Sequence, residues 1–406
     1  MPLTCHVRED GTNDVQAARS EAVPSAPSRP SGEFRDIVDA YAREGDALCR
    51  LSPAILEAMR RDGLFRSLQP RRFGGQEADL VAFFEDQMDI AAVDMSTGWL
   101  FGVMGVLAFH LALFPAEAQT DVWAADSDAL LACSYMQTGK ANIVAGGYEL
   151  AGRWRFASGA DYADWFLLGA RIARERGDEA VVFLVPRADV AIHRTWQTAG
   201  LRGTGSQDLS IERCFVPAHR VHGIRERFLG QSPGLAVNSA PLYRIPLPQL
   251  LVRVISTPAI GALRGGLAAL IDHNAVRQDI AGQRVAANPA VQLTIGEVAA
   301  DIDEMTTVLR AGVDQLSHAA AAGVDLSLQD RMILRLQASR TADRCCRLMH
   351  RIFVAAGAGG LSSEAPFGRI LADIQASRQH AANQFEPFAQ TLGASLLGLE
   401  PEDSLL

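Results

Sequence analysis

The chain has 406 residues, 48% of them hydrophobic and 21% charged, and a formal net charge of −9 at pH 7. This length suits two or three domains with a large core, since a typical domain has roughly 150 residues. The acidic balance argues against a nucleic-acid binder, which carries a basic surface. We expect no membrane partner either, because the N-terminus lacks a secretory signal and we identify no spanning stretch of roughly 18 apolar residues.

The predicted elements form blocks of different texture. Residues 1–33 are rich in proline and serine, which predicts a disordered leader. Residues 34–130 carry apolar side chains at helix spacing. Residues 131–235 hold short apolar and aromatic runs between turn residues, which predicts an antiparallel β domain. Long amphipathic helices return at 236–395, before a tail at 396–406. The predicted fold class is therefore α+β.

Single elements follow from the same patterns, with boundaries good to a few residues. Helices are predicted at 80–93, 96–113, 255–277, 291–322 and 326–356, and a last one starts near residue 367. Strands are predicted at 130–137, 148–156, 165–173, 180–186 and 210–216.

The cysteines indicate neither a disulfide framework nor a metal site. They are Cys5, Cys49, Cys133, Cys214, Cys345 and Cys346. None forms a C-x-x-C pair, and no Cys/His cluster has the spacing of zinc ligands. We therefore expect a reduced, cytoplasmic protein that binds no metal.

Two motifs of the β domain carry the most distinctive sequence. The first is RWRFASG at 153–159, where a strand ends in small residues that let another molecule approach the backbone. The second is GLRGTGS at 200–206, whose glycines and hydroxyls offer donors to a phosphate or to the polar edge of a cofactor. An ordinary turn and a hairpin connection are the plainer interpretations of these segments.

With these motifs, the chain resembles the acyl-CoA dehydrogenase superfamily. More narrowly, it resembles the group D oxygenase components of two-component flavin-dependent monooxygenases, which hydroxylate phenols such as 4-hydroxyphenylacetate and the phenolic ring of steroid catabolites. The resemblance covers about 34–395. Its other carriers are Gly98-Trp99 with His110, Phe215-Val216-Pro217, Gly368-Arg369, and Asp373 with His380. It implies an N-terminal helical domain, a central β domain, a C-terminal four-helix bundle and a homotetramer.

The resemblance also implies a flavin, FMN or FAD, held between the β domain and the bundle. The cofactor-binding residues that it implies are Trp154, Ser158, Arg202, Thr204, Gly205, Ser206, Arg277 and Gly357. Ser158 matches a residue beside the reactive edge of the flavin ring, and Arg277 matches an arginine that meets the flavin phosphate. Gly357 matches a turn contributed by another subunit. A surface salt bridge for Arg277 and a helix cap for Gly357 remain open.

His380 is the leading catalytic candidate. Many dehydrogenases of this superfamily carry a glutamate base eight residues after an aspartate, and counting from Asp373 that place is Ala381 here. The residue before it is His380, whose imidazole is a neutral base at pH 7 and suits a phenol O–H better than an unactivated C–H. Without the resemblance, a surface or capping histidine is the plainer interpretation.

Three further residues are expected at the substrate. His110 follows an apolar helical stretch, and the resemblance places it at the wall of the active site. Like His380, both His110 and Ser158 are predicted to be catalytic. Ser134 and Tyr135 lie where related hydroxylases bind substrate or flavin. A satisfied core histidine and a strand serine bonded to backbone are the alternatives.

The function implied is hydroxylation of a phenol or related aromatic compound through a flavin C4a-hydroperoxide. Reduced flavin (FMNH2 or FADH2) would come from a separate NAD(P)H-dependent reductase, and O2 is the co-substrate. The chain has no nicotinamide-binding fingerprint, which agrees with a reductase partner. The alternatives are N- or S-oxygenation by the same fold, an acyl-CoA dehydrogenase, and a flavin-binding scaffold without activity.

Overall fold

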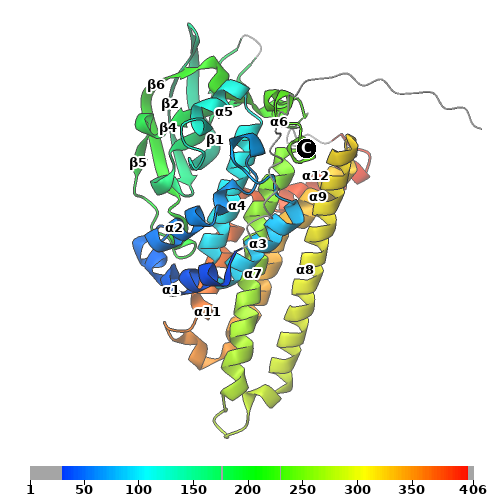
Figure 1. Cartoon of the computed structure of the whole chain (residues 1–406). Coiled ribbons are helices and arrows are strands. Elements are labelled where there is room, and N and C mark those ends of the chain that lie inside the picture. The colour runs from blue at the N-terminus through cyan, green and yellow to red at the C-terminus, as the bar shows by residue number, and fades with distance from the viewer. Residues whose placement is uncertain (1–29, 175–176, 229, 401–406) are drawn as a thin grey trace, which may run out of the picture.

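The computed structural model describes residues 30–174, 177–228 and 230–400. The leader predicted at 1–33 lies outside them up to residue 29, the tail predicted at 396–406 lies outside them from residue 401, and so does Cys5. The described chain has N-terminal helices, a central sheet and C-terminal helices, in agreement with the predicted α+β class. Figure 1 shows the sheet at one end of the molecule and the long C-terminal helices running away from it.

Five helices form the N-terminal part: α1 (Gly32–Leu48), α2 (Pro53–Arg61), α3 (Leu80–Val93), α4 (Met95–Ala112) and α5 (Ala116–Trp123). Side chains cap the first turns of α1 to α4; for example, Ser31 accepts from the Phe34 N–H, and Asp94 accepts from the Thr97 N–H. All 18 residues of α4 are buried, so this helix is a core element on every face.

Two helices contradict our expectation that no stretch has the character of a membrane span. Met95–Ala112 and Leu247–Val276 both have the length and apolar composition of one. The apolar window is 100% buried inside the protein in the first helix and 67% buried in the second. Their apolar side chains are therefore used in tertiary packing, with α4 in contact with both α7 (Leu247–Val276) and the sheet.

The central sheet has seven strands in the order β5-β6-β2-β1-β3-β4-β7. Their bounds are β1 (Leu131–Val144), β2 (Gly147–Ala157), β3 (Trp165–Ile172), β4 (Glu179–Pro186), β5 (Ala191–His193), β6 (Gln207–Pro217) and β7 (Val221–Gly223). The prediction of a purely antiparallel domain was wrong at one place, because β1 and β3 pair in parallel. Alternating apolar residues report which face of a strand is buried and carry no information on strand direction.

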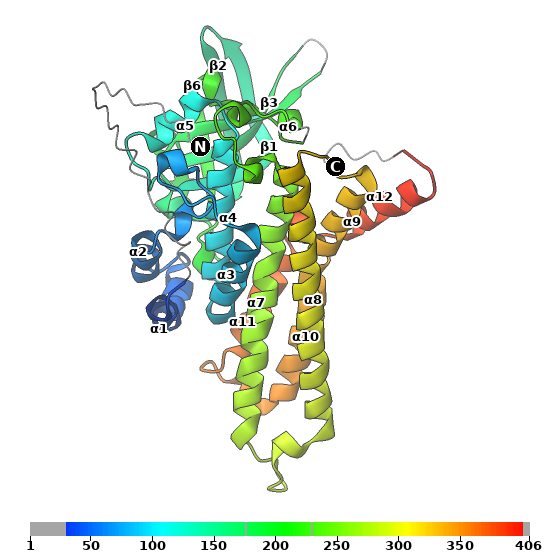
Figure 2. The ribbon, with the colours of Figure 1, turned by 45° about the vertical axis from the view of Figure 1, so that its right-hand side comes forward.

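The C-terminal part packs long helices beside α3 and α4. Its helices are α6 (Ile224–Phe228), α7, α8 (Pro289–Ala322), α9 (Leu328–Ser339), α10 (Thr341–Ala356), α11 (Phe367–Arg378) and α12 (Glu386–Leu396). The stretch predicted as one helix at 326–356 is divided at Arg340. Figure 2 shows α8 alongside α10, and α12 projecting from the far side of the bundle.

Candidate functional site

A chain of hydroxyl groups lies where the two sequence motifs of the β domain meet. Trp99 Nε1 donates to Ser158 Oγ (3.2 Å), and Ser158 Oγ lies 2.7 Å from Ser206 Oγ. Ser206 Oγ is in turn 2.7 Å from Thr204 Oγ1, which donates to the Leu201 carbonyl (2.8 Å). The predicted residues Ser158, Thr204 and Ser206 are thus brought together with α4.

The direction of every hydrogen bond in this chain is fixed by its last acceptor. A carbonyl only accepts, so Thr204 uses its one proton on Leu201 and must accept from Ser206. Ser206 must then accept from Ser158, which spends its own proton there. Since Trp99 occupies one lone pair of Ser158 Oγ, a second lone pair is left for a ligand. Ser158 is therefore set to accept an N–H or O–H, and has no proton of its own to offer.

The backbone around the hydroxyls is shaped by residues in the left-handed region. Leu201 and Gly205 both have φ of +52°, and Gly159 has φ of +75°. A Cβ on Gly159 would lie 2.2 Å from Met104 Cε, so the strand end packs directly on α4. Phe156 also has positive φ (+65°), and its ring is 52% exposed. An exposed aromatic ring two positions before Ser158 fits a flat heteroaromatic ligand.

His380 lies just beyond α11, and its ring centroid is 5.8 Å from that of Trp99. Its Nδ1 accepts from the Ala382 N–H (3.1 Å), so the neutral ring carries its proton on Nε2. Desolvation by the surrounding protein lowers the pKa of His380 from 6.5 to about 4, even though the residue remains exposed in the single chain. Both observations give a neutral imidazole at pH 7 that presents an N–H donor.

The glycine-rich loop is attached to α11 by a buried carboxylate. Leu201 N–H donates to Asp373 Oδ1 (2.6 Å). Arg369 lies among three carboxylates, at 2.6 Å from Asp94, 3.7 Å from Asp46 and 4.0 Å from Asp373. Burial, and secondarily the charge of Asp94, raises the pKa of Asp373 to about 7. Arg369 therefore only partly neutralises these three carboxylates.

The other predicted cofactor residues have different surroundings. Trp154 is 0% exposed, and its indole donates to the Gly169 carbonyl (2.7 Å). It therefore links β2 to β3 across β1 and offers no surface to a ligand. Arg202 donates to the carbonyls of Asp46 and Thr198 (2.9 and 2.8 Å) and fixes the loop.

Arg277 and Gly357 form a second group. The Arg277 guanidinium donates to the Ala356 carbonyl, and a Cβ on Gly357 would lie 3.1 Å from it. This group adjoins the start of α11, where Phe367 contacts His273. Asp373, which holds the glycine-rich loop, is six residues further, or about 9 Å along the helix. One chain therefore presents the cofactor residues in two separate groups.

The predicted substrate residues lie at the other end of α4. His110 is 0% exposed, and its Nδ1 is 2.6 Å from the hydroxyl of Tyr135. His110 is eleven positions after Trp99, about 16 Å along the helix axis. Ser134 donates to the Arg155 carbonyl (2.8 Å), which is the structural role named as its alternative.

Sequence reasoning missed His222. Its Nδ1 lies 3.2 Å from His110 Nε2, and its ring is 0% exposed. It belongs to the three-residue strand β7, which is too short to give a periodic pattern, and lies 112 positions from His110. The local sequence shows only that His222 follows a short turn, which does not mark it as a functional residue.

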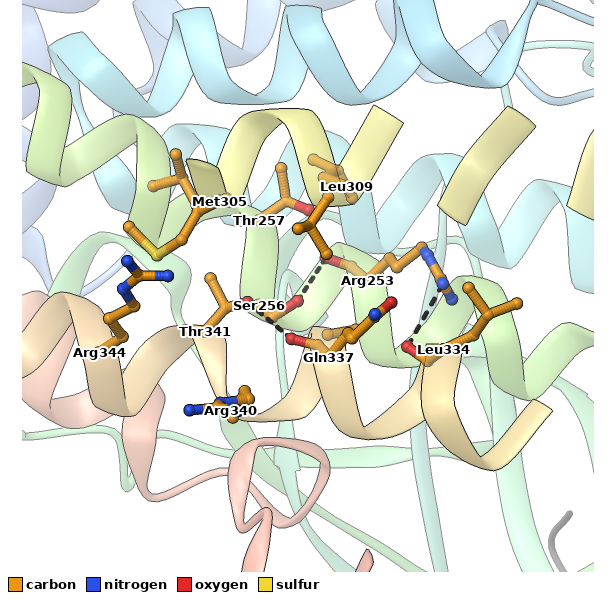
Figure 3. A pocket seen from close by; sticks show the side chains of 13 residues that line it. Arg253, Ser256, Thr257, Met305, Leu309, Leu334, Gln337, Arg340, Thr341 and Arg344 are labelled. Atoms are coloured by element: carbon orange, nitrogen blue, oxygen red, sulfur yellow. Dashed lines mark hydrogen bonds between the residues drawn. The ribbon is translucent and has the colours of Figure 1, made fainter. Parts of the chain in front are cut away.

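A separate cavity of about 260 Å³ lies inside the helical bundle, between α7, α8, α9 and α10 (Figure 3). Arg253 lines it and is buried, and no carboxylate of the described residues forms an ion pair with it. Burial lowers the pKa of Arg253 to about 10, so it stays charged at pH 7. Neither Ser158 nor His380 lines this cavity.

Known proteins resemble the chain over nearly its whole length. The family model of the acyl-CoA dehydrogenase C-terminal domain matches residues 253–385. The flavin-dependent monooxygenase oxygenase subunit HsaA of Rhodococcus jostii is 34% identical over 90% of this chain and 96% of its own. The oxygenase component of the FADH2-dependent resorcinol hydroxylase of a Rhizobium species is 33% identical over 96% of this chain and 99% of its own. The crystal structure of 3-HSA hydroxylase from a Rhodococcus species has a TM-score of 0.87 at 33% identity, covering 92% and 97% of the two chains.

The chain belongs to the oxygenase components of two-component flavin-dependent monooxygenases. It is thus an enzyme that uses reduced flavin, and an oxygenase component implies a separate flavin reductase. The dehydrogenase fold and the monooxygenase activity predicted from the motifs are both confirmed. The individual roles of the site residues stay predictions.

The hydroxyl chain fits a reduced flavin in particular. Reduced flavin carries an N–H at N5, whereas oxidised flavin has a bare nitrogen there. Ser158 has a free lone pair and no free proton, so it complements the reduced form.

We therefore expect Ser158→Ala to weaken the binding of reduced flavin by about 10-fold, the value of one hydrogen bond of about 1.4 kcal/mol. Oxidised flavin should be affected less. Anaerobic titration of both redox states measures this. Thr138→Ala is the matched control, because its hydroxyl donates to the Arg153 carbonyl on the neighbouring strand. Equal weakening of both redox states would contradict the predicted polarity of Ser158.

Proposed function

We propose that this chain hydroxylates a phenol at the ring carbon next to the hydroxyl group. The net reaction converts a phenol, reduced flavin and O2 into an ortho-diphenol, oxidised flavin and water. The observation that carries the proposal is a neutral imidazole beside the Trp99–Ser158 contact, with alanine where a dehydrogenase of this fold would carry its glutamate. The relatives named for resorcinol and p-hydroxyphenylacetate hydroxylation support a phenolic substrate.

Each residue at this end of α4 has a proposed part. When bound, reduced flavin supplies the electrons that activate O2. Ser158 would hold its N5 edge, and Phe156 would cover an apolar face. His380 would donate its Nε2 proton in a hydrogen bond to oxygen at the reacting centre. The tautomer with its proton on Nε2 favours this over proton abstraction by His380, because Nδ1 already accepts from the Ala382 N–H.

We extend the proposal to the assembly and its partner. Gly357 lies apart from the hydroxyl chain within one protomer, which supports a homotetramer in which a neighbouring subunit completes the cofactor site. The reductase would be NAD(P)H-dependent. None of the described cysteines forms a disulfide, which supports a cytoplasmic location. The use of FADH2 by the resorcinol relative favours FAD over FMN.

The test is product analysis with labelled oxygen. The purified chain is mixed with reduced FAD or FMN, 18O2 and a panel of phenols, and products are identified by mass spectrometry. We expect one 18O atom in an ortho-diphenol. The methyl ethers of the same phenols are the matched controls and should give none. Hydrogen peroxide release without any labelled diphenol would refute the proposal, and label found only in sulfur or nitrogen heterocycles would replace it with S- or N-oxygenation.

A further inference from the structure

A hydrogen-bonded series of side chains runs from Tyr135 on β1 through two histidines to Ser232, and the exposed carboxylate of Glu226 on α6 lies just beyond hydrogen-bond distance of the second histidine. Tyr135 Oη is 2.6 Å from His110 Nδ1, and His110 Nε2 is 3.2 Å from His222 Nδ1. His222 Nε2 then lies 3.0 Å from Ser232 Oγ and 3.9 Å from Glu226 Oε2. The proposed reaction gives His222, Ser232 and Glu226 no role.

The two ends and the middle of this chain differ in their access to solvent. His110 and His222 are both 0% exposed, whereas Tyr135 is half-buried. The carboxylate side chain of Glu226 is 50% exposed. The two histidines in the middle of this series are thus shielded from water. One end lies among the predicted substrate residues, and the other end is in contact with water.

The two imidazoles can hold their protons in either of two matching arrangements. In the first, Tyr135 donates to His110, His110 donates to His222, and His222 donates toward Ser232 or Glu226. In the second, every bond is reversed. Each ring is neutral in both arrangements, so no charge is left in the apolar interior when the chain switches between them. Switching moves one proton from one end to the other.

The groups around His222 favour movement toward the surface. Among the described side chains of α6, the carboxylate of Glu226 lies 3.9 Å from His222 and attracts a proton. His222 meets His110 from α4 and, from the turn after that helix, the ring of Phe114, whose centroid lies 5.1 Å away. His219, three residues earlier, is paired with Asp121 at 2.7 Å and stands outside the chain.

We propose that this series of hydrogen-bonded side chains carries the proton of the substrate hydroxyl out of the active site, with His222 as a positioning residue for proton transfer. The proposal rests on the proposed function. In this proposal the phenol lies between Ser158 and Tyr135 with its hydroxyl toward Tyr135. The substrate O–H breaks and its proton passes to the Tyr135 oxygen. Tyr135 passes its own proton to His110 Nδ1, and His110 passes that of Nε2 to His222 Nδ1. His222 releases that of Nε2 to Glu226 when this exposed carboxylate moves from 3.9 Å to hydrogen-bond distance.

The balance of the reaction returns the chain to its starting state. Phenol, reduced flavin and O2 give diphenol, oxidised flavin and water without net uptake or release of protons. A proton lost while the ring is attacked must therefore be returned when the product regains its hydroxyl. Its passage in the opposite direction restores the first arrangement of tautomers.

The test compares His222→Gln with His219→Gln. Glutamine can keep hydrogen bonds at position 222 but cannot exchange one N–H for another, so proton transfer stops while packing is retained. We expect kcat for hydroxylation to fall at least about 10-fold at pH 7, with KM and flavin affinity unchanged and a larger solvent deuterium isotope effect on kcat. His219→Gln should leave all four quantities unchanged.

A wild-type kcat and isotope effect in His222→Gln would overturn the proton route. If that variant does not fold, Tyr135→Phe interrupts the route at its inner end while keeping the ring, and the same readouts decide. Failure of the unaltered chain to make any diphenol would instead refute the proposed function, so the two failures are distinguishable.

Discussion

His380→Ala is expected to lower kcat for hydroxylation by about 100-fold, the lower range for a group that assists proton or hydrogen-bond chemistry at a reacting centre. The change removes the Nε2–H donor beside Trp99 and also the acceptor that caps the Ala382 N–H. Reduced flavin should still bind, because the hydroxyl chain at Ser158 is untouched. Oxygen consumption should therefore continue, with hydrogen peroxide released in place of diphenol. Parallel assays of both products measure this.

The matched variant His380→Gln separates two chemical roles. A glutamine amide can donate a hydrogen bond from nearly the same place, but it cannot accept a proton. Partial recovery of kcat in His380→Gln would support the donor role that the Nε2-protonated tautomer indicates. If glutamine is as poor as alanine, His380 is a base and the donor assignment is wrong. His318→Ala, on the exposed face of α8, should change neither product.

Arg369→Met is expected to destabilise the fold by about 3–5 kcal/mol at pH 8, because it leaves buried carboxylates without their cation. Asp94 and Asp373 would repel each other, and Asp46 lies near both. Asp373 also holds the Leu201 N–H, so the glycine-rich loop should loosen and reduced flavin should bind more weakly. Urea unfolding monitored by circular dichroism measures the free energy.

The pH dependence of this loss has a definite sign. The pKa of Asp373 is raised in the folded state to about 7, so its protonated form contributes stability that is complete below the unfolded pKa of 3.8 and is lost as pH rises through 7. The destabilisation by Arg369→Met should therefore be smaller at pH 5 than at pH 8. Asp373→Asn is the companion variant and should make the unfolding free energy less dependent on pH over the same interval. An equal loss at pH 5 and 8 would contradict this account.

The long helices and the two glycine-containing motifs could be predicted from sequence, because each is a local pattern. The helix predicted at 80–93 has those bounds in the structure, and the segments around Ser158 and Thr204 do meet. The parallel pairing of β1 with β3 could not be predicted, since strand direction depends on how the chain crosses over between them. The division of the helix at Arg340 also has no glycine or proline to signal it.

The chemistry of the histidines was harder to predict than their presence. The tautomer of His380 is set by a backbone N–H two residues later, which depends on the turn that follows α11. A role for His222 in proton transfer can be inferred only from its contact with His110, which lies on an element far away in the sequence. Trp154 lies in a motif of the family but is buried inside the sheet, so a motif can mark a residue that supports the site from behind.

The buried helix α4 carries a contact with each half of the site, Trp99 with Ser158 and His110 with Tyr135. Because it is closed in on all sides, it can neither bend nor slide to adjust the spacing between them. The helix therefore fixes the distance between Trp99 and His110 at about 16 Å along its axis. Inserting or deleting one residue would swing one contact by about 100° around the axis relative to the other. Any chain that keeps both contacts must therefore also keep the number of residues between them.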